Sequence, residues 1–73
     1  MTQTKYQMLI QWSDSDCCYV VSLPDFPELR QPCTDGETYE EAARHGHELI
    51  ESLILWYGQE GKPLPHPQTL QPV

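Results

Sequence analysis

The sequence predicts an α+β domain in which a three-stranded antiparallel sheet packs on one long helix. Residues 5–12 alternate between apolar and polar side chains, as a half-buried strand does, and residues 17–23 are rich in β-branched and aromatic side chains. Residues 36–58 instead repeat apolar side chains at helical spacing. A chain of 73 residues forms one domain at most. We place this domain at residues 1–61 and a proline-rich tail at residues 62–73.

The first two predicted strands form a hairpin. Tyr6, Met8, Ile10 and Trp12 share one side of the first strand, and Gln7, Leu9 and Gln11 share the other. The polar residues 13–16 predict a short turn, so the two strands are antiparallel. Both faces of the second strand contain a valine, Val20 on one and Val21 on the other, which leaves open which face meets the helix.

The third strand is predicted to be short and to lie at an edge. Pro24 and Pro27 end the second strand, and Phe26 between them is expected to fill the core. Residues 29–34 contain Pro32, which cannot donate to a ladder of hydrogen bonds and therefore belongs on an edge strand. Residues 35–36 then turn the chain into the helix.

The predicted helix has clear start and stop signals. Thr38 is a favourable N-cap, and Glu41 three residues later completes a capping box, so the helix begins at about Tyr39. Gly58 or Gly61 offers a left-handed end.

One face of this helix is apolar and the opposite face is charged. The apolar arc contains Tyr39, Ala42, Ala43, Gly46, Leu49, Ile50, Leu53, Ile54 and Tyr57, and the opposite arc contains Glu40, Arg44, Glu48 and Glu51. Glycine in a helix costs about 1 kcal/mol relative to alanine. Gly46 in the apolar arc therefore indicates close approach of the sheet.

The tail holds four of the seven prolines, which favours an extended or disordered segment. Two alternatives remain open for it. It lies across the fold through Leu64 and Leu70, or it is the point where longer relatives attach a second domain.

Charge and composition exclude several classes of function. Eleven carboxylates against four basic residues give a net charge of −7, which opposes nucleic-acid backbones and anionic membranes, so we expect no direct nucleic-acid binding by this chain alone. The sequence shows neither a membrane-spanning run nor a signal peptide, and we expect a cytoplasmic protein. Three cysteines are an odd number and imply no disulfide framework.

The polar residues predict no metal, cofactor or catalytic site. His45 and His47 are two positions apart on a helix and diverge by about 200°, so they cannot share one ion. Asp14 and Asp16 lie in a turn, and not at a strand centre where a two-metal nuclease site would need them. We therefore expect a protein that is not an enzyme.

The remaining signals favour a partner-binding surface. Leu55 falls in the middle of the charged helical face, and Trp56 lies at the margin of the apolar arc. The predicted partner-binding residues are Glu40, Glu41, Glu48, Glu51, Leu55 and Trp56. Open edge strands pair readily with another chain, so we also expect a homodimer or a higher homo-oligomer.

Three short motifs, in this order and spacing, resemble those of the HicB-like antitoxin family. The matching residues are Leu23, Pro24, Asp25, Phe26 and Pro27; then Gly36, Glu37, Thr38, Glu40, Glu41 and Ala42; and then Gly61, Lys62, Pro63, Leu64 and Pro65. The resemblance covers residues 6–67, nearly the whole chain.

This resemblance implies a fold, a partner and an activity. The implied fold is a degraded ribonuclease H-like arrangement of three antiparallel strands and one helix. The implied partner is a HicA-like toxin, a small basic ribonuclease that cleaves mRNA and is neutralised when its active site is covered. Longer members add a DNA-binding domain after the position of Pro67, which this sequence does not show, and Glu28 replaces a usual glycine. The alternative is an orphan single-domain homo-oligomer without a toxin.

Overall fold

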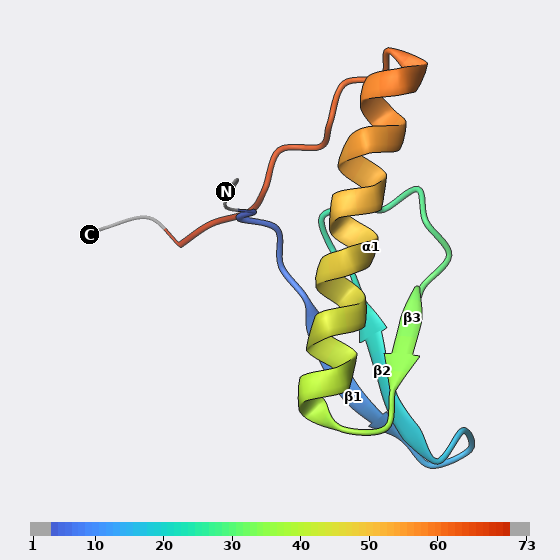
Figure 1. Ribbon diagram of the computed structural model, residues 1–73. Coiled ribbons are helices and arrows are strands. Elements are labelled where there is room, and N and C mark those ends of the chain that lie inside the picture. Colours follow the sequence, from blue (N-terminus) through green and yellow to red (C-terminus); the bar gives the residue numbers. More distant parts are fainter. Residues whose placement is uncertain (1–3, 71–73) are drawn as a thin grey trace.

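A three-stranded sheet and one helix make up the protein, in the order β-β-β-α. The computed structural model describes residues 4–70, with β1 at Leu9–Ser13, β2 at Cys18–Ser22, β3 at Thr34–Gly36 and α1 at Tyr39–Glu60. The strands lie in the order β1-β2-β3, both pairs are antiparallel, and α1 covers one face of the sheet (Figure 1). This arrangement confirms the predicted α+β fold class.

The hairpin of β1 and β2 is closed by the predicted polar turn. The register runs from Leu9 opposite Ser22 to Ser13 opposite Cys18. In the turn, the Cys17 N–H donates to the Ser13 carbonyl at 2.8 Å, and the Ser13 hydroxyl donates to Asp16 Oδ2 at 2.8 Å. Short polar side chains here bond to their own turn, as their residue types predict.

Strand β1 is shorter at its start than the predicted strand of residues 5–12. Because β2 ends at Ser22, opposite Leu9, the residues before Leu9 have no strand to pair with. The Gln7 N–H instead donates to Asp25 Oδ2 at 2.9 Å, in the loop after β2. A side chain thus replaces the missing partner strand.

Strand β3 lies at residues 34–36 and not at the predicted residues 29–34, so that prediction is wrong. The Gln31 side chain bonds the backbone of Leu23 through both its oxygen, at 2.8 Å, and its nitrogen, at 3.0 Å. Its nitrogen also donates to the Phe26 carbonyl at 3.0 Å. Backbone pairing with β2 begins only after Pro32, where the Cys33 N–H donates to the Val21 carbonyl at 2.8 Å.

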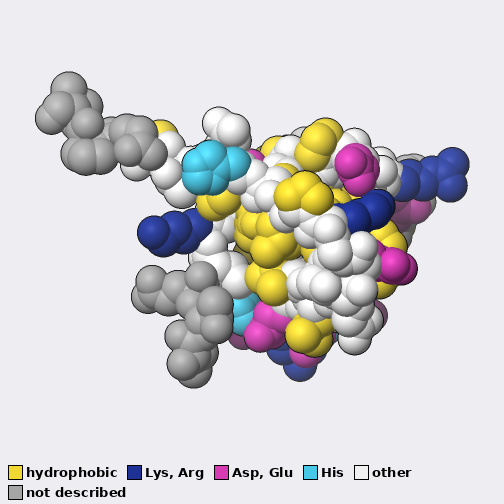
Figure 2. Space-filling view, turned by 90° about the horizontal axis from the view of Figure 1, so that it is seen from above, with side chains coloured by type: hydrophobic (Ala, Val, Ile, Leu, Met, Phe, Trp, Pro, Cys, Tyr) yellow, Lys and Arg dark blue, Asp and Glu magenta, His cyan; other side chains and the backbone are white. Residues whose placement is uncertain are grey.

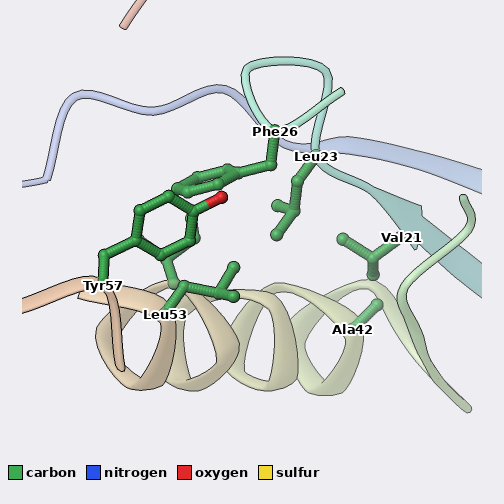
Figure 3. Close-up of a cluster of buried hydrophobic side chains, with 7 residues drawn as sticks. Val21, Leu23, Phe26, Ala42, Leu53 and Tyr57 are labelled. Carbon is green, nitrogen blue, oxygen red and sulfur yellow. The ribbon is translucent and has the colours of Figure 1, made fainter. Parts of the chain in front are cut away.

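The core lies between the sheet and α1. It contains Val21, Leu23, Phe26, Ala42, Ile50, Leu53 and Tyr57. The face of β2 that carries Val21 therefore meets the helix, which answers the question that the sequence leaves open. Phe26 is fully buried, as predicted, and its ring lies edge-on to that of Tyr57 with centroids 5.9 Å apart (Figure 3).

The start of α1 is capped by Thr38, as predicted. The Thr38 hydroxyl accepts from the Glu41 N–H at 3.0 Å. The Glu41 carboxylate accepts in return from the N–H of Glu37 at 3.3 Å, and not from that of Thr38 as a standard capping box would require. The helix still begins at Tyr39, because one side-chain bond to the first turn is enough to define the cap.

The helix ends at Gly61, the second of the two predicted stops. Gly61 adopts φ 67°, a left-handed conformation that glycine reaches without steric penalty. The N–H of Lys62 then donates to the Tyr57 carbonyl at 2.9 Å. Gly58 continues the helix.

Gly46 is the position where the sheet comes closest to the helix. A Cβ atom at Gly46 would lie 2.5 Å from Met8 Sδ and 3.1 Å from Val21 Cγ1. The predicted close approach is confirmed.

Tyr39 belongs to the apolar arc predicted from the sequence but is 63% exposed, because it is the first residue of the helix.

The tail is extended and lies against the N-terminal segment (Figure 1). The Tyr6 hydroxyl donates to the Pro65 carbonyl at 2.8 Å, and the Gln68 N–H donates to Asp25 Oδ1 at 3.3 Å. Leu70 is fully exposed and Leu64 is 42% exposed. The tail thus lies across the fold, but the hydrogen bonds that hold it come from Pro65 and Gln68 and not from its leucines. Residues 71–73 of the predicted tail lie outside the described residues.

Within residues 4–70, the single helix is too polar to qualify as a membrane span.

Candidate partner-binding surfaces

Four of the six predicted partner-binding residues share the outer face of α1. Glu40, Glu48, Glu51 and Leu55 are all exposed on the side of the helix away from the sheet. Leu55 is 69% exposed and lies one turn from Glu51. We refer to these four residues as the acidic helix face.

The carboxylates of this face are mostly unpaired. Glu51 Oε1 lies 3.5 Å from His47 Nδ1, and this is the only ion pair that involves the face within residues 4–70. Arg44 stands one turn from both Glu40 and Glu48, yet it forms a salt bridge with neither. Apart from the Glu51–His47 pair, the carboxylates of this face therefore have no salt-bridge partner among residues 4–70.

The other two predicted residues, Glu41 and Trp56, are used within the chain. Glu41 is half-buried, and its carboxylate holds the Glu37 N–H. Trp56 is 43% exposed, but the Lys62 ammonium lies over its ring, 4.8 Å from the centroid. This cation–π contact covers part of the ring surface that a partner would need.

Two hollows adjoin the acidic helix face. One, of about 240 Å³, is lined by Thr4, Glu51, Ile54 and Leu55. The other, of about 450 Å³, is lined by Thr38, Glu40, Glu41 and Arg44 at the start of the helix. Both are open depressions in which a partner's side chain could rest beside a carboxylate.

A second surface was not predicted from the sequence: a row of three aromatic rings, which we call the aromatic row. Trp12 and Tyr19 are cross-strand neighbours whose ring centroids are 5.1 Å apart at 74°. The ring of Tyr39, the first residue of α1, also contacts that of Tyr19, with centroids 4.3 Å apart and an interplanar angle of 33°. Trp12 is 52% exposed and Tyr39 is 63% exposed, so both of these rings face solvent.

The sequence contains a signal that could have revealed this row. A four-residue turn fixes the hairpin register, and that register places Trp12 opposite Tyr19 on one face. What the sequence does not contain is the position of Tyr39, because it depends on where α1 begins relative to the end of the sheet.

The aromatic row lies at an acidic end of the molecule. Residues 14–16 and 35–41 contain six carboxylates and no lysine or arginine: Asp14, Asp16, Asp35, Glu37, Glu40 and Glu41. Burial raises the pKa of Cys18 in this region, and the charges of Asp35 and Asp16 raise it further. Burial likewise raises the pKa of Tyr19, with a further contribution from Tyr39.

The cysteines and histidines do not converge on a common point. Cys17, Cys18 and Cys33 are free thiols. His45 Nδ1 lies 2.6 Å from the Asp35 carbonyl, whereas His47 faces Glu51. In the part of the chain that the structure describes, no three histidine, cysteine or carboxylate side chains are arranged to hold a metal ion.

Comparison of this chain with known protein families, with curated proteins and with solved structures finds no match.

Proposed function

We propose that this protein is an antitoxin-type binding protein that neutralises a small basic ribonuclease of the HicA kind by covering its active site. The protein contributes surface and charge, and the inhibition requires no covalent chemistry. The resemblance of the three sequence motifs names the class of partner, and the molecular surface supplies the physical reason for binding.

The acidic helix face carries this proposal. An exposed leucine on the same helical face as three exposed carboxylates, only one of which is in an ion pair, combines an apolar contact with charges that a basic protein complements. The face also lies opposite the sheet, so the core does not need to open for a partner to reach it.

The first experiment identifies the partner. The tagged full chain is recovered from its native cell with and without nuclease treatment, and the retained proteins are determined by mass spectrometry. We expect one small basic protein in stoichiometric amount, retained after nuclease treatment. Recovery of this chain alone would contradict the proposal.

The second experiment tests the surface. We expect the double variant Glu48→Lys and Glu51→Lys to weaken binding of the recovered partner about 10-fold near 0.15 M salt, because two attractive charges become repulsive. The control is Glu28→Lys with Glu60→Lys, which makes the same change in charge at two other exposed positions. If both double variants weaken binding equally, net charge and not the helix face determines affinity.

A second candidate function is that of an orphan homo-oligomer, and the uncovered face of the sheet favours it. Leu9 on that face is about half exposed, and β1 is an edge strand with no partner on its outer side within the described residues. Sedimentation equilibrium over a wide concentration range measures the oligomer, and the recovery of a basic partner from the cell separates the two candidates. A dimer that persists with no basic partner in the cell supports the oligomer.

A further inference from the structure

We propose that the aromatic row binds an arginine side chain of a basic partner segment, with the guanidinium against the exposed rings of Trp12 and Tyr39. The inference depends on the proposed function only for the identity of that partner. It assigns a second contact, which adjoins the acidic helix face at Glu40, to a surface of defined chemistry.

The geometry of the row is fixed before any partner arrives. Tyr19 contacts both other rings, with centroids 5.1 Å from Trp12 and 4.3 Å from Tyr39, so it supports the position of each. The Trp12 indole N–H donates to Asp14 Oδ1 at 2.9 Å, which sets the direction of that ring. A ring that is already ordered loses little conformational entropy on binding.

The charge around the row selects a cation. The Asp14 carboxylate bonds the Trp12 indole, and the segments of residues 14–16 and 35–41 that contribute Asp14 and Tyr39 hold six carboxylates and no lysine or arginine. A cation over an aromatic face is attracted by the negative face of the ring, and nearby carboxylates add to that attraction. The surface therefore fits a basic segment better than an apolar one.

The same molecule already uses this chemistry at its other tryptophan. Lys62 covers Trp56 at 4.8 Å and lies 6.0 Å from the centroid of Tyr57. These are the cation–π contacts within residues 4–70, so no described residue places a cation over the rings of the aromatic row. A partner's cation could occupy that position.

Arginine fits this row better than lysine. Its guanidinium is planar and stacks on aromatic rings while its N–H groups reach carboxylates at the edge. A lysine ammonium is a compact, strongly hydrated charge and gains less from a flat aromatic surface. Attraction by charge alone would not distinguish the two residues, so the preference for arginine tests the role of the rings.

The test uses the two tryptophans as separate probes. The full chain, labelled with ¹⁵N, is titrated near 0.15 M salt with a short peptide of arginines and with a lysine peptide of equal length. We expect the indole N–H signal of Trp12 to shift and that of Trp56 to stay, with arginine binding more tightly. Equal shifts at both indoles, or equal affinity for both peptides, would overturn the proposal.

A matched pair of variants tests the rings directly. Tyr39→Leu keeps an apolar side chain at this exposed position but removes the π face, and Tyr39→Phe retains that face. We expect Tyr39→Leu to weaken binding of the arginine peptide about 2- to 5-fold and Tyr39→Phe to bind like the wild type. Wild-type binding by Tyr39→Leu would overturn the proposal.

The peptide titration and the recovery of a partner from cells fail independently. If the Trp12 indole responds to arginine but no basic protein is recovered, the aromatic row stands and the antitoxin function fails. If a basic protein is recovered but the Trp12 indole does not respond, the function stands and the aromatic row is not its arginine site.

Discussion

At the scale of single residues, Asp25 connects three segments that are distant in sequence. Its carboxylate accepts from the backbone and side chain of Gln7, at 2.9 and 3.2 Å, and from the Gln68 N–H at 3.3 Å. The residue is almost fully buried, so these bonds replace the water that the carboxylate loses on folding. One side chain thereby holds the N-terminal segment and the tail against the loop after β2.

We expect Asp25→Asn to lower the free energy of unfolding by about 1–3 kcal/mol. The amide supplies one acceptor oxygen where the carboxylate supplies two, and its NH₂ group faces donors that are then unsatisfied. Urea denaturation measures the loss. The matched control is Asp14→Asn in the exposed turn, where we expect a change within about 0.5 kcal/mol. Equal effects at the two positions would contradict the role assigned to Asp25.

Residues with a local role could be predicted from the sequence, and residues with a distant partner could not. Thr38 caps the helix through an N–H three residues away, and its type and spacing are visible in the chain. Asp25 and Gln31 bond to atoms that only the folded chain brings near. Their residue types alone suggest turns and surface positions.

At the scale of elements, the packing of α1 on β2 depends on Gly46. Two glycines of the same helix separate packing from helix propensity: a Cβ at Gly46 meets Met8 and Val21, whereas a Cβ at Gly58 meets no atom within 4 Å. The conformational gain from alanine is similar at both positions, so any difference between the two substitutions reports contact with the sheet.

We expect Gly58→Ala to raise the free energy of unfolding by up to about 1 kcal/mol. Gly46→Ala should lower it by about 1–3 kcal/mol, because Val21 lies in the central strand and must shift to admit a methyl group. Thermal and urea unfolding of both variants provide the measurement. Stabilisation by Gly46→Ala would show that Met8 and Val21 move away at little cost.

The elements themselves were predictable where a periodic pattern extends over several turns or residues. The helix and the hairpin follow from such patterns, and both are observed. Strand β3 contains only three residues, too few for a pattern, and its position depends on the bonds that Gln31 makes to Leu23. Its displacement therefore has a tertiary cause.

At the scale of the whole molecule, the tail contributes to stability although it has no helix or strand within residues 62–70. It joins the fold through the Tyr6 hydroxyl and the Asp25 carboxylate. Burial raises the pKa of Tyr6, and the nearby Asp25 charge raises it further, so the folded state favours the neutral phenol that donates to Pro65.

We expect removal of residues 63–73 to leave a folded domain whose free energy of unfolding is about 1–3 kcal/mol lower, because two hydrogen bonds and the contacts around them are lost. A group whose pKa is raised on folding stabilises the protein below its unfolded pKa, here 10.0, and this contribution is lost as the pH rises through the folded value. Urea denaturation of the full and truncated chains should therefore show a smaller difference in their free energies of unfolding above pH 10 than at pH 8. A constant difference would contradict this role of Tyr6.

The candidate surfaces were predictable only in part. Helical spacing places Glu40, Glu48, Glu51 and Leu55 on one face, and the structure brings them together there. Spacing does not show that Trp56 is covered by Lys62, which follows the left-handed turn at Gly61. The aromatic row joins two strands and the helix, so it exists only in the assembled fold.

The uneven placement of charge also affects how fast the molecule meets a partner. Six of its eleven carboxylates lie in residues 14–16 and 35–41, whereas all four basic residues lie elsewhere. We expect this acidic end to be attracted towards a positive surface before contact. Added salt should then slow association more than it speeds dissociation.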